Sequence, residues 1–157
     1  LEGKTICREA ARGVILKGRS LLMIHSLKDG DFKFPGGGIK TGETHENALV
    51  REIKEESGAI VLSIIDELGK VIEFDIPAEK DYDCFKMVSY YYICEVAQNL
   101  GEQSLDQYEK DLGFTPEWVD IDEAISTNKK VIDSESFPLW TPRELFVLEY
   151  IKDTLQL

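Results

Sequence analysis

The sequence contains few cysteines, and their positions argue against the structures that cysteine-rich proteins use. Three cysteines occur among the 157 residues, at positions 7, 84 and 94, and no two of them form a CxxC pair. This number and spacing disfavour a disulfide framework or a zinc site and are typical of reduced thiols in a cytoplasmic protein. A catalytic cysteine would have only His25 and His45 as partners, which makes it the weaker interpretation.

Positive charge and long apolar runs are also scarce. Lys and Arg number 18 against 30 Asp and Glu, so the net charge is −12. This excess argues against nucleic acid polymers and anionic membranes as partners, because both are bound through basic patches. No run approaches the ~18 consecutive apolar residues of a membrane span. We expect no membrane segment, and the N-terminal residues show no signal-peptide pattern.

The composition is otherwise that of a folded domain, with 43% hydrophobic and 31% charged residues. No internal repeat or linker divides the chain, so we expect a single domain over residues 1–157. Apolar and β-branched runs predict strands at 11–16, 20–25, 59–65, 70–76, 88–96 and 117–120. Residues 27–32, 77–83 and 98–113 are predicted to be loops, and residues 34–38 a turn.

Three segments predict helices. Residues 44–57 have Thr44 as a candidate N-cap and Gly58 at the position after the helix. Residues 122–127 predict a short helix, and residues 141–155 an amphipathic one that begins Thr-Pro-Arg-Glu, with Thr141 as N-cap and Glu144 at the third helical position. Strands mixed with helices favour a mixed α/β (α+β) domain.

The first of these helices carries the chemistry. At 100° per residue, Glu52, Glu55 and Glu56 share a stripe about 100° wide, while Ile53, Ser57 and Val50 lie on the opposite side and can face a core. Crowded like charges repel one another, and a divalent cation removes that penalty. Ligands that are all oxygen select a hard ion such as Mg²⁺, Mn²⁺ or Ca²⁺. The competing interpretation is an acidic helix face that is simply solvated.

A glycine run precedes the helix. Gly36, Gly37 and Gly38 let the backbone approach a ligand without a Cβ in the way. Peptide carbonyls from this turn can supply a further metal ligand beside the carboxylate stripe. Phosphates bridged by Mg²⁺ suit such a site, because this ion prefers a few carboxylates together with phosphate oxygens and water.

This stretch resembles the box of the Nudix (MutT-like) hydrolase family, G-x5-E-x7-R-E-U-x-E-E-x-G-U, where U is a bulky apolar residue. The match covers residues 37–59, and only the small Ala59 departs from the pattern. The matching residues are Gly37, Glu43, Arg51, Glu52, Ile53, Glu55, Glu56 and Gly58. Weaker similarity lies at residues 11–25, 34–36 and 117–124. The resemblance implies an α/β/α sandwich with a central mixed sheet.

The resemblance further implies a Mg²⁺-dependent hydrolase, with Mn²⁺ as a substitute, that acts on a nucleoside diphosphate linked to another moiety. Glu52 and Glu56 would be metal ligands, with Glu55 a third ligand or the activator of water. The carbonyl of Gly36 would be another ligand. Arg51 and Glu43 would hold the carboxylates in place.

Family members draw the general base from the box or from a later loop. The candidates for a later carboxylate are Glu102, Glu109 and Glu117, of which Glu109 is weakly favoured. A carboxylate in this role takes the proton of the attacking water, while the metal lowers the pKa of that water.

Substrate contacts are expected outside the carboxylate stripe. The candidates are Arg8, Arg12, His25, Phe34, Gly37 and Gly38, with Phe32, Tyr82 and Phe85 as further aromatics that could stack on a base. A surface salt bridge for each arginine, an edge position for His25 and a core position for each aromatic ring are the competing interpretations. His45 is predicted to be a surface residue.

The substrate stays open between 8-oxo-purine triphosphates, ADP-ribose and nucleotide sugars, because neither Pro77 nor Tyr82 lies at a spacing from the box that marks one of them. A regulatory module that binds a nucleotide without cleaving it is the alternative function. The expected partner is a small nucleotide, and the chain is expected to be a monomer or a homodimer.

Overall fold

The computed structural model describes residues 4–157. Its elements in chain order are β1 (Thr5–Val14), β2 (Leu16–Lys17), β3 (Ser20–Ser26), β4 (Phe32–Lys33), β5 (Gly36–Gly38), α1 (His45–Ser57), β6 (Val61–Asp75), β7 (Cys84–Val96), α2 (Gln107–Leu112), β8 (Phe114–Asp120), α3 (Ile121–Ile132) and α4 (Thr141–Leu155).

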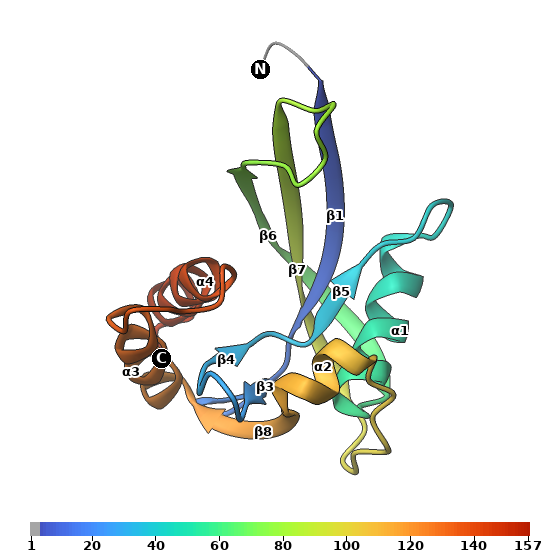
Figure 1. Cartoon of the computed structure of the whole chain (residues 1–157). Coiled ribbons are helices and arrows are strands. Elements are labelled where there is room, and N and C mark those ends of the chain that lie inside the picture. The colour runs from blue at the N-terminus through green and yellow to red at the C-terminus, as the bar shows by residue number, and fades with distance from the viewer. Residues whose placement is uncertain (1–3) are drawn as a thin grey trace.

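The strands form two sheets. One has the order β5-β1-β7-β6, and it is mixed because β1 is parallel to β7 while the other pairs are antiparallel. In the other, β3 pairs with β2, β4 and β8. Helix α1 lies on one side of the strands and α3 and α4 on the other (Figure 1). The predicted mixed α+β fold with a central mixed sheet is confirmed.

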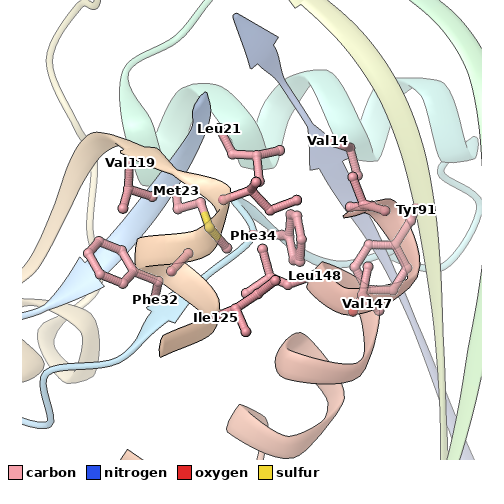
Figure 2. Packing of buried hydrophobic residues seen from close by; sticks show 13 residues of the cluster. Val14, Leu21, Met23, Phe32, Phe34, Tyr91, Val119, Ile125, Val147 and Leu148 are labelled. Carbon is pink, nitrogen blue, oxygen red and sulfur yellow. The ribbon is translucent and has the colours of Figure 1, made fainter. Parts of the chain in front are cut away.

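The core is divided between the two sides of the strands. One cluster joins Leu49 and Ile53 of α1 to Ala11 of β1 and Leu22 of β3. The larger cluster packs α3 and α4 against the strands, with Phe34 in its centre among Tyr91, Leu148 and Met23 (Figure 2). Helix α1 therefore packs against β5 on one side of the strands, and α3 and α4 pack against β4 on the other (Figure 1).

Helix α1 begins and ends as its sequence predicts. The Thr44 side chain accepts a hydrogen bond from the Asn47 N–H, and Gly58 is left-handed with φ 80°. Ile53 and Ser57 are buried as expected. The expectation for Val50 is wrong, because its side chain is 38% exposed.

Three strands begin earlier than predicted, β1 at Thr5, β7 at Cys84 and β8 at Phe114. Two further differences concern β6 and β5. Residues 61–75 form one strand, β6, where a break was predicted between 65 and 70. Strand β6 lies at the edge of its sheet, and its pairing with β7 shifts register three times. The strand therefore continues through the polar residues Asp66 and Glu67. Residues 36–38, predicted to be a turn, pair with β1 as β5.

The predicted loop at 98–113 is wrong in its second half, which forms α2. Asp106 caps this short helix, and Glu109 reaches back to the Asp106 N–H in a capping box. For α4 the predicted range is confirmed, but Trp140 rather than Thr141 is at the N-cap and makes no side-chain bond there. Glu144 is fully buried and bonds other elements.

The upper parts of β1, β6 and β7 extend beyond the helices as a long arm that ends in the 77–83 loop (Figure 1). Within residues 4–157 the three cysteines are unpaired, as predicted. No helix in this range has the length and apolar character that crossing a bilayer requires.

Candidate active site

The glycine turn, residues 36–38, forms strand β5 and pairs with β1 beside the site. Gly36 pairs with Arg12 and has φ +151°. A Cβ at Gly36 would lie 2.2 Å from the Ala11 carbonyl oxygen, so only glycine fits this close approach. A Cβ at Gly37 would lie 2.5 Å from an Oε2 atom of Glu52, which places that carboxylate directly against the turn.

Arg51 connects the acidic residues of the box. Its Nε and Nη2 donate to the two carboxylate oxygens of Glu43, each at 2.8 Å, and its Nη1 donates to Glu52 at 2.7 Å. Weaker contacts reach Glu55 at 3.4 Å and the Gly38 carbonyl at 3.1 Å. The hydrogen bonds from Arg51 lower the pKa of Glu43 to about 2. The guanidinium therefore contacts Glu43, Glu52 and Glu55 at the same time.

Glu56 is buried and forms an ion pair with Lys33. Lys33 Nζ donates to its Oε1 at 2.5 Å, and the Gly36 N–H donates to the same oxygen at 3.3 Å. The pKa of Glu56 is raised to about 7. Burial is the main cause, Lys33 opposes the increase, and the nearby Glu109 contributes to it. Lys33 is not among the site residues predicted from the sequence. The available signal was one cation between Phe32 and Phe34 in an apolar segment.

Glu109 is the later carboxylate that the fold brings to the box. Its charge raises the pKa of Glu52 and Glu56, in both cases after the larger effect of burial. The chain before α2 is fixed to α1, because the Ser104 N–H donates to the Glu55 carbonyl and Gln103 Nε2 to the Glu56 carbonyl. The other candidates lie elsewhere.

Glu117 lies 3.0 Å from His25 Nδ1 on the neighbouring strand, and Glu102 is exposed. Burial, followed by the charges of Glu55 and Glu109, raises the pKa values of the box carboxylates, which Arg51 and Lys33 lower. Of the three later candidates, Glu109 is thus the one whose charge acts on Glu52 and Glu56.

The donor chemistry of this cluster fits a hard divalent cation. Within residues 4–157 no three His, Cys, Asp or Glu side chains form a ready-made metal centre. Arg51 and Lys33 instead hold Glu52 and Glu56, whose raised pKa values show that ionisation is costly while no further positive charge is present. A divalent ion would supply that charge, and carboxylates with a peptide carbonyl are the ligands it prefers.

The structure separates the candidate substrate contacts. Arg8 is exposed and lines a surface cavity of about 450 Å³ together with Gly38 and Glu43. Arg12 is only 6% exposed and donates to Ser89. Phe34 is fully buried in the core, so its ring is not available to stack on a base.

Two histidines are held by aromatic neighbours. His25 stacks on Phe32 with ring centroids 4.5 Å apart. His45 is half-buried rather than a free surface residue, because its Nδ1 lies 2.7 Å from the Tyr92 hydroxyl and its ring contacts Tyr90.

Comparisons with known proteins agree with this geometry. The NUDIX domain family matches residues 8–140. An RNA pyrophosphohydrolase of Campylobacter jejuni is 43% identical over 51 residues, 32% of this chain and 33% of that protein. An ADP-ribose pyrophosphatase of Methanocaldococcus jannaschii is 46% identical over 54 residues, 32% of each chain. The match therefore spans about a third of the length of these relatives.

Solved structures show the same fold at low sequence identity. A MutT NUDIX hydrolase from Burkholderia pseudomallei has a TM-score of 0.58 at 18% identity, covering 90% of this chain and 97% of that one. A NUDIX hydrolase from Nitrosomonas europaea has a TM-score of 0.58 at 19% identity, covering 85% and 94%. With a family match that extends over most of the chain, from residue 8 to residue 140, the protein belongs to the Nudix family.

Proposed function

We propose that this protein hydrolyses a pyrophosphate bond in a nucleoside diphosphate linked to another moiety, with Mg²⁺ as its cofactor. The observation that carries the proposal is the arrangement of the box carboxylates. Arg51 holds Glu43, Glu52 and Glu55, while Lys33 and the glycine turn hold Glu56 beside them. A solvated acidic helix face would have neither the burial of Glu56 nor its partners.

Each residue of the cluster has a separate role. Glu52, Glu55, Glu56 and the Gly36 carbonyl would hold the ion, for which Mn²⁺ is a substitute. A bound ion would supply positive charge that neutralises the pyrophosphate and would lower the pKa of water. Glu55 or Glu109 would accept the proton of the attacking water. Arg51 keeps the carboxylates in position.

The substrate class follows from the acidic surface and the neighbouring cavity. A net charge of −12 disfavours long anionic polymers and leaves a small nucleotide as the preferred partner. Arg8 and Lys40, both exposed at the cavity that Gly38 and Glu43 also line, are cations available to a substrate phosphate. The relatives named as an RNA pyrophosphohydrolase and an ADP-ribose pyrophosphatase define two members of the test panel.

The test is a hydrolysis assay with Mg²⁺ on ADP-ribose, nucleotide sugars, 8-oxo-purine triphosphates and an RNA with a 5′ triphosphate, in which the products, two phosphate monoesters or a monophosphate with pyrophosphate, are separated by chromatography. Glu52→Gln and Glu55→Gln should lose at least ~10²-fold in kcat/KM on whichever substrate is cleaved. Glu149→Gln, an exposed change on α4, is the matched control and should keep full activity.

Each other outcome has a defined meaning. Equal turnover by the wild type and both box variants would refute the proposed site. Binding of a nucleotide with no cleavage across the panel would instead favour a regulatory module. No change in thermal stability on adding Mg²⁺ or Mn²⁺ would favour a non-enzymatic domain, because a ligand that binds only the folded state must stabilise it.

A further inference from the structure

The segment from Asp31 to Pro35 leads into the glycine turn and carries Lys33. At its end the Pro35 carbonyl accepts from the Gly13 N–H of β1 at 2.8 Å, whereas β4 itself, among the described residues, pairs with a strand on one side only. Strand β4 pairs with β3 through Lys33 with Ile24 and through Phe32 with His25. Its other side faces α3 and α4, and side chains of the C-terminal region bind it there.

The Asn128 side chain of α3 takes the place of a neighbouring strand. Its Oδ1 accepts from the Phe32 N–H and its Nδ2 donates to the Phe32 carbonyl, both at 2.9 Å, and Asn128 is fully buried. Trp140 Nε1 donates to the Asp31 carboxylate at 2.8 Å. The segment is therefore fixed by groups that follow the box by many residues.

Glu144 of α4 makes the contact nearest to the turn. One carboxylate oxygen accepts from the Phe34 N–H at 3.1 Å, and the other accepts from the Tyr91 hydroxyl at 2.8 Å. Arg143 Nη2 lies 3.3 Å from the Oε1 atom of Glu144. A fully buried carboxylate costs free energy unless it is paired and hydrogen-bonded, and this one is both.

The two glutamates divide the donors of the turn between them. Pro35 has no N–H, so Phe34 and Gly36 provide its backbone donors on either side of the proline. Glu144 accepts the first from the C-terminal side of the molecule, and Glu56 accepts the second from the box.

We propose that Glu144 is a positioning residue that fixes the Phe34-Pro35-Gly36 backbone so that the Gly36 carbonyl and Lys33 face Glu56. This inference rests on the proposed function. It assigns to α4, a helix outside the box, control over the geometry of the metal-binding turn. Glu144 acts through the backbone and does not itself contact the reacting atoms.

The test compares two variants of one helix in the full-length protein. Glu144→Leu removes the acceptor for the Phe34 N–H, whereas Val147→Ala opens a cavity in the same core cluster without touching the turn. Glu144→Leu should lower kcat about 10²-fold, the effect of a displacement of about 1 Å at a site, with KM nearly unchanged. Val147→Ala should change kcat less than about 2-fold.

Mn²⁺ affinity, measured without substrate by the shift in thermal unfolding, is the second readout. It should fall at least ~10-fold in Glu144→Leu, because the Gly36 carbonyl is displaced, and stay unchanged in Val147→Ala. Glu144→Gln keeps an acceptor for the Phe34 N–H and should restore kcat to within about 3-fold of wild type. If Glu144→Leu does not fold, Glu144→Asp replaces it and should give a smaller loss of the same kind.

The inference is overturned if Glu144→Leu and Val147→Ala give the same kcat and the same Mn²⁺ affinity. That result leaves the proposed function intact, because the wild type would still cleave its substrate. Inactivity of the wild type on the whole panel refutes the proposed function instead, and the Mn²⁺ affinities of the variants then decide the role of Glu144 separately.

Discussion

Replacing Lys33 by Met tests whether the buried Glu56 is ionised at the expense of stability in the metal-free protein. Lys33 Nζ and Glu56 form a pair in which both side chains are less than a tenth exposed. Methionine retains most of the aliphatic volume and removes only the charge. The experiment therefore isolates the electrostatic contribution of one cation at the candidate site.

The magnitude follows from the pKa of Glu56, which burial raises from 4.5 to about 7. A carboxyl whose pKa is higher in the folded protein costs stability above that value, and the cost disappears as the pH falls toward the unfolded pKa. At about 1.4 kcal/mol for each tenfold change in proton affinity, the cost is about 3 kcal/mol. The wild type in EDTA should therefore gain up to about 3 kcal/mol between pH 8 and pH 5 from this group.

Without Lys33 the pKa of Glu56 rises further, because the ammonium is the main group that lowers it. Above pH 8 the variant must either bury an unpaired charge, at about 3–5 kcal/mol, or take up a proton. At pH 6 Glu56 is already mostly protonated in the wild type, so the loss there should be below about 1 kcal/mol.

The assay is urea unfolding in EDTA at pH 6 and pH 9. Lys130→Met, an exposed change on α3, is the control and should give no loss at either pH. The double variant Lys33→Met/Glu56→Gln should recover most of the stability at pH 9, because it removes both partners of the pair. Equal losses for Lys33→Met at both pH values would refute the reasoning, since a packing defect does not depend on pH.

Three further predictions concern the turn, the arginine and the end of α1. Gly37→Ala should lower kcat/KM at least ~10-fold with little loss of stability, because its Cβ would meet the Glu52 carboxylate. Gly38→Ala is the control and should be neutral, because its Cβ would meet nothing within 4 Å. Identical steady-state kinetics and thermal melts for the two variants would contradict this prediction. Arg51→Lys should lower kcat/KM about 10²-fold because one ammonium cannot reproduce the planar fork, and near-wild-type kinetics would contradict it. Gly58→Ala should cost more than about 1 kcal/mol in urea unfolding, since φ is 80° and its Cβ would lie 2.1 Å from a backbone oxygen of the 98–106 loop.

The sequence predicted the parts of the site that depend on neighbours along the chain. Helix α1 with its Thr44 cap and Gly58 end follows from local rules, and its carboxylate stripe follows from helical spacing. The connection from Arg51 to Glu43, eight residues apart, lies within the box itself. These features required no knowledge of how distant segments pack.

The missed residues have partners far away in the chain. Lys33 bonds a residue 23 positions later, Phe32 is bound by Asn128 96 positions later, and Phe34 by Glu144 110 positions later. In the sequence, Glu144 fits the third position of a helix start, and this local interpretation concealed its buried role. Phe34 was a candidate for stacking on a base, with a core position as the alternative, and the packing that brings α4 to the turn buries its ring in the core.

Helix α2 is a different case, because its signal was local and could have been used. Asp106 and Glu109 stand three residues apart, the spacing of a capping box, directly before Leu112 and Gly113. The acidic composition of residues 98–113 favoured a loop instead. Recognising this capping box would have placed Glu109 on a helix and strengthened its selection over Glu102 and Glu117.

The distribution of charge at the site explains how so acidic a chain can both fold and recruit an anion. Arg51 and Lys33 face a group of five carboxylates made of Glu43, Glu52, Glu55, Glu56 and Glu109. The two cations hold the group together in the metal-free protein, but they leave it net negative. Burial raises the pKa values of Glu52 and Glu56, and the charges of neighbouring carboxylates add to this increase. A divalent ion is the partner that this residual charge would bind, and the bound ion would in turn attract an anionic substrate.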